Sequence, residues 1–553
     1  KFLVFRNGGS DWGKAHCRDA VLTGLLQDPS WDLDHQANRP ALLYINGKYW
    51  GLYHIREKIN KRFVQDHRGY DKDELDLLEH QMTVKAGSSK AYQEFLSWVR
   101  DHRFDNDRHY AVLQGQMDVD NFMRLQIAQL YFDNRDAGGN IRFFRPHQLD
   151  EWGEQKWRWI LYDVDYSFGL NDSESYKFPT LALHTEANGP KWPNPPWTTL
   201  LQRRLLDNSN YRKDFVNRCL DYLQTDFSPP RVIAAIHSHA ARLRPEMPRA
   251  LARWNLPLQH WERHIDRMKT FAQHRPAYVR EEVRSYFKGG PDREVLLSQT
   301  PGGELILNDN IHLNTLQWEG HYFANFPIKI RAKPLPGFRF DRWEGLAEQE
   351  QLLPQLSVNL QRDTRYQFRA LFLPYDHPKA GQIVINEIHH GPTGGWIELH
   401  NTSKQAFNLR DWFLADLAGK EVRLLNMDIL PGEFLVLTSD PALVSPATLA
   451  APVVLTSLDR LLTQNTLGLY NQRGAKMHRV TYRKEVSIGK FYALDRQAND
   501  QSSADWSITE RSSPGLVNPN PAVRIGLLQS EVQWRLVAGL LICFFFWRWV
   551  RKR

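Results

Sequence analysis

The stretch QIAQLYFDNRDAGGN at residues 126–140 and the later stretch WRWILYDVDYSFG at residues 157–169 decide the fold that we predict. A helix is predicted over residues 121–132, because carboxylates stand just before it, where they complement the dipole of a first helical turn. The helix runs into a short glycine-containing loop, which presents the carboxylate of Asp136 and the carboxamide of Asn140.

Two predicted strands, at 141–144 and 157–162, follow this loop, and the second leads directly to Asp163 and Asp165. Alternate residues of an extended strand point the same way, so these two carboxylates can share one metal ion. Hard oxygen ligands grouped in this way suit Mg²⁺ or Mn²⁺ rather than Zn²⁺.

The order of these groups is similar to that required for phosphoryl transfer by kinases. Such enzymes use a loop Asp that orients the acceptor hydroxyl, a downstream Asn, and a later Asp on the metal that bridges the phosphates. The spacing departs from the usual kinase loop: Asn140 comes four residues after Asp136 instead of five, and Asn134 replaces the His. From the residues alone an alternative stays open, in which Asp136 caps a turn and the later Asp pair is a solvated strand end.

A β-hairpin is predicted earlier in the chain, where Asn46-Gly47 separates the β-rich runs 40–45 and 48–55. The second strand closes on three charged residues, Arg56, Glu57 and Lys58, where a kinase places a phosphate-binding cation and its acidic partner. Alternation predicts that Arg56 and Lys58 share one face and that Glu57 points to the other. The chain has no G-x-G-x-x-G phosphate loop.

Five separated motifs within residues 5–221 resemble the spore-coat protein H (CotH-like) family of atypical kinases. They are FRNGGSDW with CRDA (5–12 and 17–20), NGKYWGLYHIREKI (46–59), DNF (120–122), the 134–140 loop, and WRWILYDVD (157–165). The resemblance implies an α+β, protein-kinase-like catalytic domain that transfers phosphate from ATP to Ser or Thr of proteins with Mg²⁺ or Mn²⁺.

Residue by residue, the resemblance implies that Asp136 is the catalytic Asp and that Asn140, Asp163 and Asp165 lie at the metal, with the dominant one of the two aspartates undecided. It also adds candidates for binding ATP. The full set of these candidates is Arg6, Arg18, Arg56, Glu57 and Lys58, and the sequence does not choose among them.

Helices are predicted over 197–285, with Pro248, Pro257 and Pro276 marking the breaks between them. After residue 289, β-type runs separated by Gly and Pro dominate, which predicts all-β modules. We expect a CotH-like domain at 1–288, a small β spacer at 289–375, a further β domain at 380–520 and a hydrophobic tail at 532–553.

The 380–520 part resembles a lamin-tail domain, which implies an immunoglobulin-like sandwich. The motifs are IVINEI (383–388), WIELHNTS (396–403), NLRDWFL (408–414), LPGEFLVL (430–437) and SPGLVN (513–518). The spacer motif GFRFDRWEG (337–345) is similar to short β-repeats of bacterial surface proteins and implies no chemistry.

The two ends of the chain carry further expectations. The chain begins inside a strand-like run without an initiator Met, so we interpret the kinase-like domain as truncated at its N-terminus. At the other end LVAGLLICFFFW (536–547) precedes a basic cluster. We expect a membrane-anchoring helix whose basic end stays cytoplasmic, with the bulk of the protein extracytoplasmic.

The composition favours a folded, multidomain chain. Of 553 residues, 42% are hydrophobic and 24% charged, and the net charge of +8 favours acidic or phosphate-bearing partners. No run of basic residues and no known nucleic-acid-binding motif accompanies the charge, so nucleic acid is not expected as a partner. The three cysteines have no metal-ligand spacing and are interpreted as structural.

The favoured hypothesis is an atypical Ser/Thr protein kinase that acts on surface proteins. Two rivals stay open. One is a non-catalytic surface scaffold with a kinase-like fold, and the other is a hydrolase that uses Asp136 and Asp163 as paired carboxylates. Nothing in the sequence fixes the oligomeric state.

Overall fold

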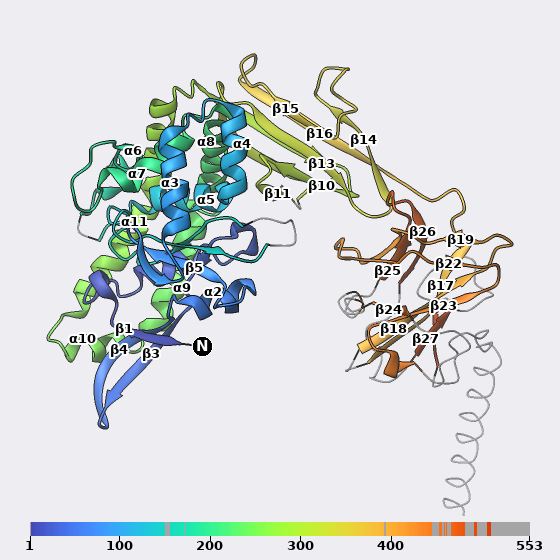
Figure 1. Ribbon diagram of the computed structural model, residues 1–553, viewed down its shortest axis with the longest axis horizontal. Coiled ribbons are helices and arrows are strands. Elements are labelled where there is room, and N and C mark those ends of the chain that lie inside the picture. The colour runs from blue at the N-terminus through green and yellow to red at the C-terminus, as the bar shows by residue number, and fades with distance from the viewer. Residues whose placement is uncertain are drawn as a thin grey trace, which may run out of the picture.

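A computed structural model describes residues 2–149, 155–170, 172–313, 315–391, 394–444, 453–455, 458, 461, 466–481, 491–494 and 506–509. In Figure 1 the N-terminal strands and most of the helices form one body. Long strands extend from that body toward a further set of strands nearer the C-terminus. The prediction of an α/β region followed by β modules is therefore confirmed.

The first sheet is three-stranded, with the order β1-β4-β3, where β1 is Leu3–Arg6, β3 is Asn38–Ile45 and β4 is Lys48–Glu57. The predicted hairpin is confirmed: Ile45 pairs with Lys48, and the turn residues Asn46 and Gly47 have φ of 50° and 74°. Both φ values are positive, as the tight turn requires, and Asn and Gly tolerate them best. The pairing of β1 with β4 places Arg6 opposite His54.

The second sheet has the order β2-β8-β7-β5-β6 and carries the predicted strand pair near the catalytic loop. Its members are β2 (Asp34–His35), β5 (Leu75–Glu79), β6 (Thr83–Ala86), β7 (Arg142–Pro146) and β8 (Arg158–Leu161). The predicted helix before the loop is confirmed as α5 (Val119–Phe132), and the Asp118 side chain accepts a hydrogen bond from the Asn121 N–H at 2.9 Å.

Most of the other helices surround this sheet and share one apolar core with it. They are α1 (Arg18–Gly24), α3 (Lys90–Asp101), α4 (Asp107–Gln116), α6 (Thr180–Thr185), α7 (Pro196–Leu205), α8 (Ser209–Gln224), α9 (Pro229–Leu243), α10 (Met247–Ala252) and α11 (Leu258–Phe287). Helix α2 (Lys61–Arg68) packs through Phe63 and Val64 into a smaller, separate apolar cluster.

The expected break at Pro276 is wrong, because α11 continues through this residue and is 30 residues long in total. Proline removes one backbone hydrogen bond, but tertiary contacts compensate for that loss. The neighbouring Arg275 is completely buried, and its guanidinium donates to the carbonyls of Leu130 (2.7 Å) and Phe178 (2.8 Å). Pro248 and Pro257 do stand at helix starts, as predicted.

Two four-stranded sheets follow the helices, with the orders β11-β10-β13-β15 and β12-β9-β16-β14. The strands are β9 (Asp292–Gln299), β10 (Gly303–Leu307), β11 (Ile311–Leu313), β12 (Gln317–Phe323), β13 (Ile328–Pro334), β14 (Phe338–Glu344), β15 (Gln355–Val358) and β16 (Arg365–Pro374). Their apolar residues belong to the same continuous core as the helices. The carboxylate of Asp221 on α8 joins the two parts by accepting hydrogen bonds from Tyr322 (2.5 Å), Asn308 (2.8 Å) and Asn310 (3.1 Å).

The last part has a core of its own, between a six-stranded sheet (β24-β23-β18-β17-β27-β28) and a four-stranded sheet (β21-β20-β25-β26). Two sheets that are antiparallel except for the parallel pair β23–β24 agree with the sandwich expected from the alternating apolar runs. The strands are β17 (Ile383–Gly391), β18 (Gly394–Asn401), β19 (Phe407–Asn408), β20 (Phe413–Ala415), β21 (Glu421–Arg423), β22 (Asp428–Ile429), β23 (Phe434–Thr438), β24 (Val453–Val454), β25 (Thr466–Tyr470), β26 (Lys476–Thr481), β27 (Phe491–Leu494) and β28 (Trp506–Thr509).

The expected membrane helix at 532–553 lies outside the described residues. None of the helices in the described ranges combines the length and the apolar character that a bilayer crossing needs. Cys17 and Cys219 are both buried and form no disulfide.

Candidate active site

Asp163 and Asp165 converge on one guanidinium, that of Arg6 at the end of β1. The Nη2 atom of Arg6 donates to Asp163 Oδ1 and, at 2.5 Å, to Asp165 Oδ2. The prediction that the two carboxylates lie together agrees with this geometry, but the reason given for it is wrong. Strand β8 ends at Leu161, and Asp163 has a φ of 56°, so strand alternation does not extend to this pair. A left-handed backbone at Asp163 brings the carboxylates together instead.

The turn after β1 closes against the same carboxylates. The Ser10 N–H donates to Asp165 Oδ2 at 3.1 Å, and a Cβ at Gly9 would overlap both that oxygen and the guanidinium of Arg6. Gly9 also has a φ of 60°, a conformation that favours glycine. The Asn7–Ser10 turn is therefore a wall of the site.

Burial controls the charge of Asp165. Only 2% of this residue is exposed, and desolvation raises the pKa of its carboxyl to about 6, although Arg6 acts in the opposite direction. Burial lowers the pKa of Arg6, but the two carboxylates outweigh it, and the net shift is upward. At neutral pH the Asp165 carboxyl is thus mostly ionised and lies beside the guanidinium of Arg6.

Asp136 lies on the loop after α5, as predicted, and is fixed by Asn140. The Nδ2 atom of Asn140 donates to Asp136 Oδ2 at 2.8 Å and to the Asp163 carbonyl at 3.4 Å, so Asn140 joins the loop to the carboxylate segment. The Asp136 N–H in turn donates to Asn134 Oδ1 at 3.1 Å. Desolvation raises the pKa of the Asp136 carboxyl, with a further upward contribution from Asp163.

The acidic partner of Arg56 is not Glu57. Arg56 is 3% exposed and forms an ion pair with Asp19, which lies on α1 and which the sequence analysis had assigned no role. Glu57 instead accepts from the Ala37 N–H at 3.1 Å and lies 3.0 Å from His67 Nε2. Lys58 comes after the last residue of β4 and is exposed, so the predicted shared face with Arg56 is not formed.

Arg18 is completely buried, so its guanidinium interacts with other groups of the protein and not with bulk solvent. It forms an ion pair with Asp11 and donates to the carbonyls of Phe168 (3.3 Å) and Gly169 (3.4 Å). Those carbonyls lie just after the Asp163–Asp165 segment. We therefore assign Arg18 to positioning this segment, and it also lines the cavity beside Arg6 and Arg56.

The donors present would suit an anionic ligand. A small cavity of about 10 Å³ lies beside Arg6, Gly8, Asp19 and Arg56. Within the described part of the chain, the Nε and Nη2 atoms of Arg56 are buried without hydrogen-bond partners. Burial, followed by repulsion from Arg6, lowers the pKa of Arg56 to about 10. An anion in this cavity would satisfy these donors and reverse that shift.

The residues also fit Mg²⁺ rather than a fully protein-bound metal. Over the ranges that the structure describes, no three or more His, Cys, Asp or Glu gather as metal ligands. Mg²⁺ usually keeps several waters and is held by one or two carboxylates plus substrate phosphates. Asp163 and Asp165 supply such a pair, and the guanidinium of Arg6 lies between them as the cation.

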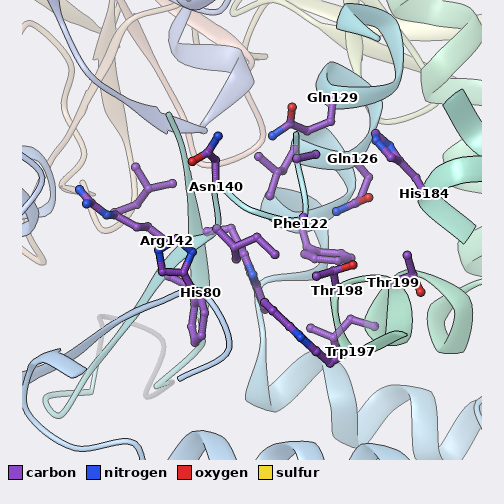
Figure 2. Close-up of a pocket in the computed structure, with 18 of the residues that line it drawn as sticks. His80, Phe122, Gln126, Gln129, Asn140, Arg142, His184, Trp197, Thr198 and Thr199 are labelled. Carbon is purple, nitrogen blue, oxygen red and sulfur yellow. The ribbon is translucent and has the colours of Figure 1, made fainter. Parts of the chain in front are cut away.

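A second cavity, of about 60 Å³, lies under the 134–140 loop. Figure 2 shows Asn140 facing this cavity, with His80 and Arg142 on one side and Thr198 and Thr199 of α7 on the other. Asn140 therefore contacts both Asp136 and a hollow large enough for part of a substrate.

Comparison with known proteins agrees with this geometry. The family model described as CotH kinase protein matches residues 1–279, and the Lamin Tail Domain model matches residues 377–484. No curated protein matches the chain. A crystal structure of a DUF4876 family protein from Bacteroides thetaiotaomicron VPI-5482 has 8% sequence identity to the chain, and the match covers 41% of this chain and 99% of that one. Its TM-score is 0.18, so it carries no argument about this fold.

Proposed function

Because the chain belongs to the CotH kinase protein family, we propose that its kinase-like domain transfers phosphate from ATP, with Mg²⁺ or Mn²⁺, to Ser or Thr hydroxyls of other proteins. The observation that carries the proposal is the convergence of Asp163 and Asp165 on one cation beside the Asp136–Asn140 loop. Phosphoryl transfer depends mainly on positioning and on neutralising charge, and these groups can do both.

Asp136 has the role of orienting the acceptor hydroxyl and accepting its proton. Its raised pKa makes it a better proton acceptor than an exposed Asp, and the hydrogen bond from Asn140 fixes its direction. Asp163 and Asp165 would hold the divalent cation. When bound, ATP with its cation supplies the phosphoryl group and neutralises the charge on the phosphates.

Arg56 has the role of the phosphate-binding cation, and Asp19 on α1 the role of its acidic partner. In protein kinases a strand Lys and a helix Glu form such a pair, and it must be in place for activity. The ion pair between β4 and α1 supports this assignment, together with the unpaired donors of Arg56 that border the cavity. Arg6 is the second cation of the site, and release from the carboxylates would let it reach a phosphate.

A location at the cell surface agrees with the combination of a CotH domain and a lamin-tail domain in one chain. The acceptor would then be a surface or extracytoplasmic protein. The membrane anchor and its short cytoplasmic end remain expectations from the sequence at 532–553.

The test uses the full chain with γ-labelled ATP, Mg²⁺ or Mn²⁺, and a Ser-rich acceptor protein. Label should appear on Ser or Thr of the acceptor, and Asp136→Asn should reduce transfer by roughly a hundredfold or more while Mg-ATP binding persists. The Glu57→Gln variant is the matched control, because Glu57 lies at the end of β4, outside the Asp136 loop, and contacts Ala37 and His67.

A chain that binds no Mg-nucleotide in a thermal-shift assay would contradict the proposal and favour the non-catalytic scaffold. Release of sugar from glycans without nucleotide, abolished by changing Asp136 or Asp163, would instead support a hydrolase. Each outcome thus separates one of the three hypotheses from the others.

A further inference from the structure

A basic groove lies between the C-terminal part of α7 and the end of α11. It is open to solvent and has a volume of about 710 Å³. Its charged lining residues are Arg203, Arg204, Arg212, Lys288 and a single carboxylate, that of Asp207. Four cations thus face one acid, in a chain whose net charge is already +8.

These arginines are held by neutral carbonyl oxygens rather than by carboxylates. Arg203 donates to the Pro196 carbonyl at 3.2 Å, and Arg212 donates to the Leu206 carbonyl at 2.6 Å. The nearest ion-pair contact of Asp207, to Arg204, is 3.8 Å long. The guanidinium groups are therefore fixed in direction, while most of their positive charge is left uncompensated.

The guanidinium groups of Arg203 and Arg204 repel each other at the centre of the groove. Burial, followed by the charge of Arg204, lowers the pKa of Arg203, and Asp207 only partly opposes this. Tyr286 is 46% exposed, and with Phe287 it adds an aromatic wall to the groove. Fixed cations beside an aromatic wall suit an acidic polypeptide, which carries both carboxylates and apolar side chains.

The other end of α7 touches the catalytic loop. A Cβ at Gly138 would overlap the Pro193 carbonyl, and a Cβ at Gly139 would overlap the ring of Trp192, so the segment before α7 lies on this loop. Trp192 itself is 64% exposed. Figure 2 shows Thr198, in the first turns of α7, at the cavity beside Asn140.

Helix α7 thus connects the catalytic loop to the basic groove. Its 10 residues span about 15 Å, a distance that about four or five extended residues of another chain cover. A polypeptide whose hydroxyl lies at Asp136 can therefore reach the groove with residues about four to six positions away.

We propose that this groove binds an acidic segment of the protein acceptor and so selects Ser or Thr residues that have Glu or Asp about four to six positions away. The inference rests on the proposed function for the identity of the occupant, but the groove can be tested without catalysis.

The binding experiment uses the full chain without nucleotide and fluorescein-labelled peptides with one central Ser. One peptide has three Glu after the Ser, a second has them before it, and a third has Gln in their place. Anisotropy should show that one Glu peptide binds about tenfold or more tightly than the Gln peptide, with an affinity that falls as salt is added.

Lys288→Glu should weaken that binding about fivefold or more, and it changes an exposed side chain rather than one that holds a carbonyl. The Arg242→Glu variant, an equal change of charge at an exposed position of α9, is the control and should bind as the unchanged chain does. A Lys288→Glu chain that still binds the Glu peptide normally would overturn the proposal. Tighter binding of an unrelated oligonucleotide, or competition by inorganic phosphate alone at equal concentration, would overturn the choice of an acidic polypeptide.

Phosphate transfer to the same peptides separates the two proposals. Binding that depends on Lys288, without any transfer to Ser, would leave the groove intact and contradict the kinase. Equal transfer to the Glu and Gln peptides would support the kinase and contradict the groove.

Discussion

The substitution Asp165→Asn should stabilise the protein while it weakens binding of Mg-ATP. Asp165 is 2% exposed, and burial raises the pKa of its carboxyl from 3.8 to about 6. A shift of about 2 pKa units corresponds to about 3 kcal/mol between the protonated and ionised forms. Keeping the Asp165 carboxyl ionised, as nucleotide binding requires, thus lowers the free energy of unfolding.

The sign of the pH dependence follows from linkage. Between pH 4 and 6 the folded protein keeps a proton on Asp165 that the unfolded chain has released, so the free energy of unfolding falls as the pH rises. The Asn variant has no such proton. Its free energy of unfolding should therefore equal that of the unchanged protein near pH 4 and exceed it by about 3 kcal/mol above pH 7.

Thermal unfolding at a series of pH values measures this difference, which should reach about 4 °C at pH 8, because the helices and the two sheets that follow them share one large core. Two unit charges 4 Å apart interact by about 4 kcal/mol at an effective dielectric constant of 20, so loss of one carboxylate should weaken Mg-ATP binding at least about a hundredfold. For the unfolding measurements, and not for Mg-ATP binding, Asp163→Asn is the control, since this position is more exposed and Asn tolerates its positive φ. An Asp165→Asn protein that melts below the unchanged protein by the same amount at every pH would refute the reasoning.

Three further substitutions test other parts of the structure. Gly9→Ala should weaken Mg-ATP binding about tenfold or more in a titration, because its Cβ would overlap the site, whereas Gly47→Ala, also at positive φ but in open space, should leave binding unchanged. Asp19→Asn should lower the thermal midpoint by leaving Arg56 buried without a counter-charge, a loss of about 3–5 kcal/mol, and a second change, Arg56→Met, should restore much of it. Asp221→Ala should lower the free energy of unfolding in urea by about 3 kcal/mol, since three side chains lose their acceptor, and Asp221→Asn should cost less.

Local features could be predicted from the sequence because they depend on neighbouring residues. The Asn46-Gly47 pair determines the hairpin turn, since few other residues adopt positive φ twice in succession. The Asp118 cap and the apolar spacing after it determine α5, and α5 in turn fixes where the 134–140 loop begins. The order of Asp136, Asn140, Asp163 and Asp165 indicated phosphoryl transfer, and the five separated motifs indicated the family.

Contacts between distant segments could not be predicted in the same way. The chain offers many arginines and aspartates of equal chemistry, and only the path of the backbone decides which of them meet. The path of the backbone brings Arg6 to Asp163, 157 residues away in the sequence. It pairs Arg56 with Asp19 rather than with the adjacent Glu57, and it buries Arg18.

The sequence by itself therefore determined the secondary structure around the catalytic loop, the family and the identity of the carboxylates, because hydrogen bonds and periodicity over a few residues encode them. The tertiary structure alone decided how the cations are distributed, how Gly9 closes the site and why Asp163 takes a left-handed backbone. Ion pairing in a buried site depends on desolvation and distance, and both are properties of the folded chain.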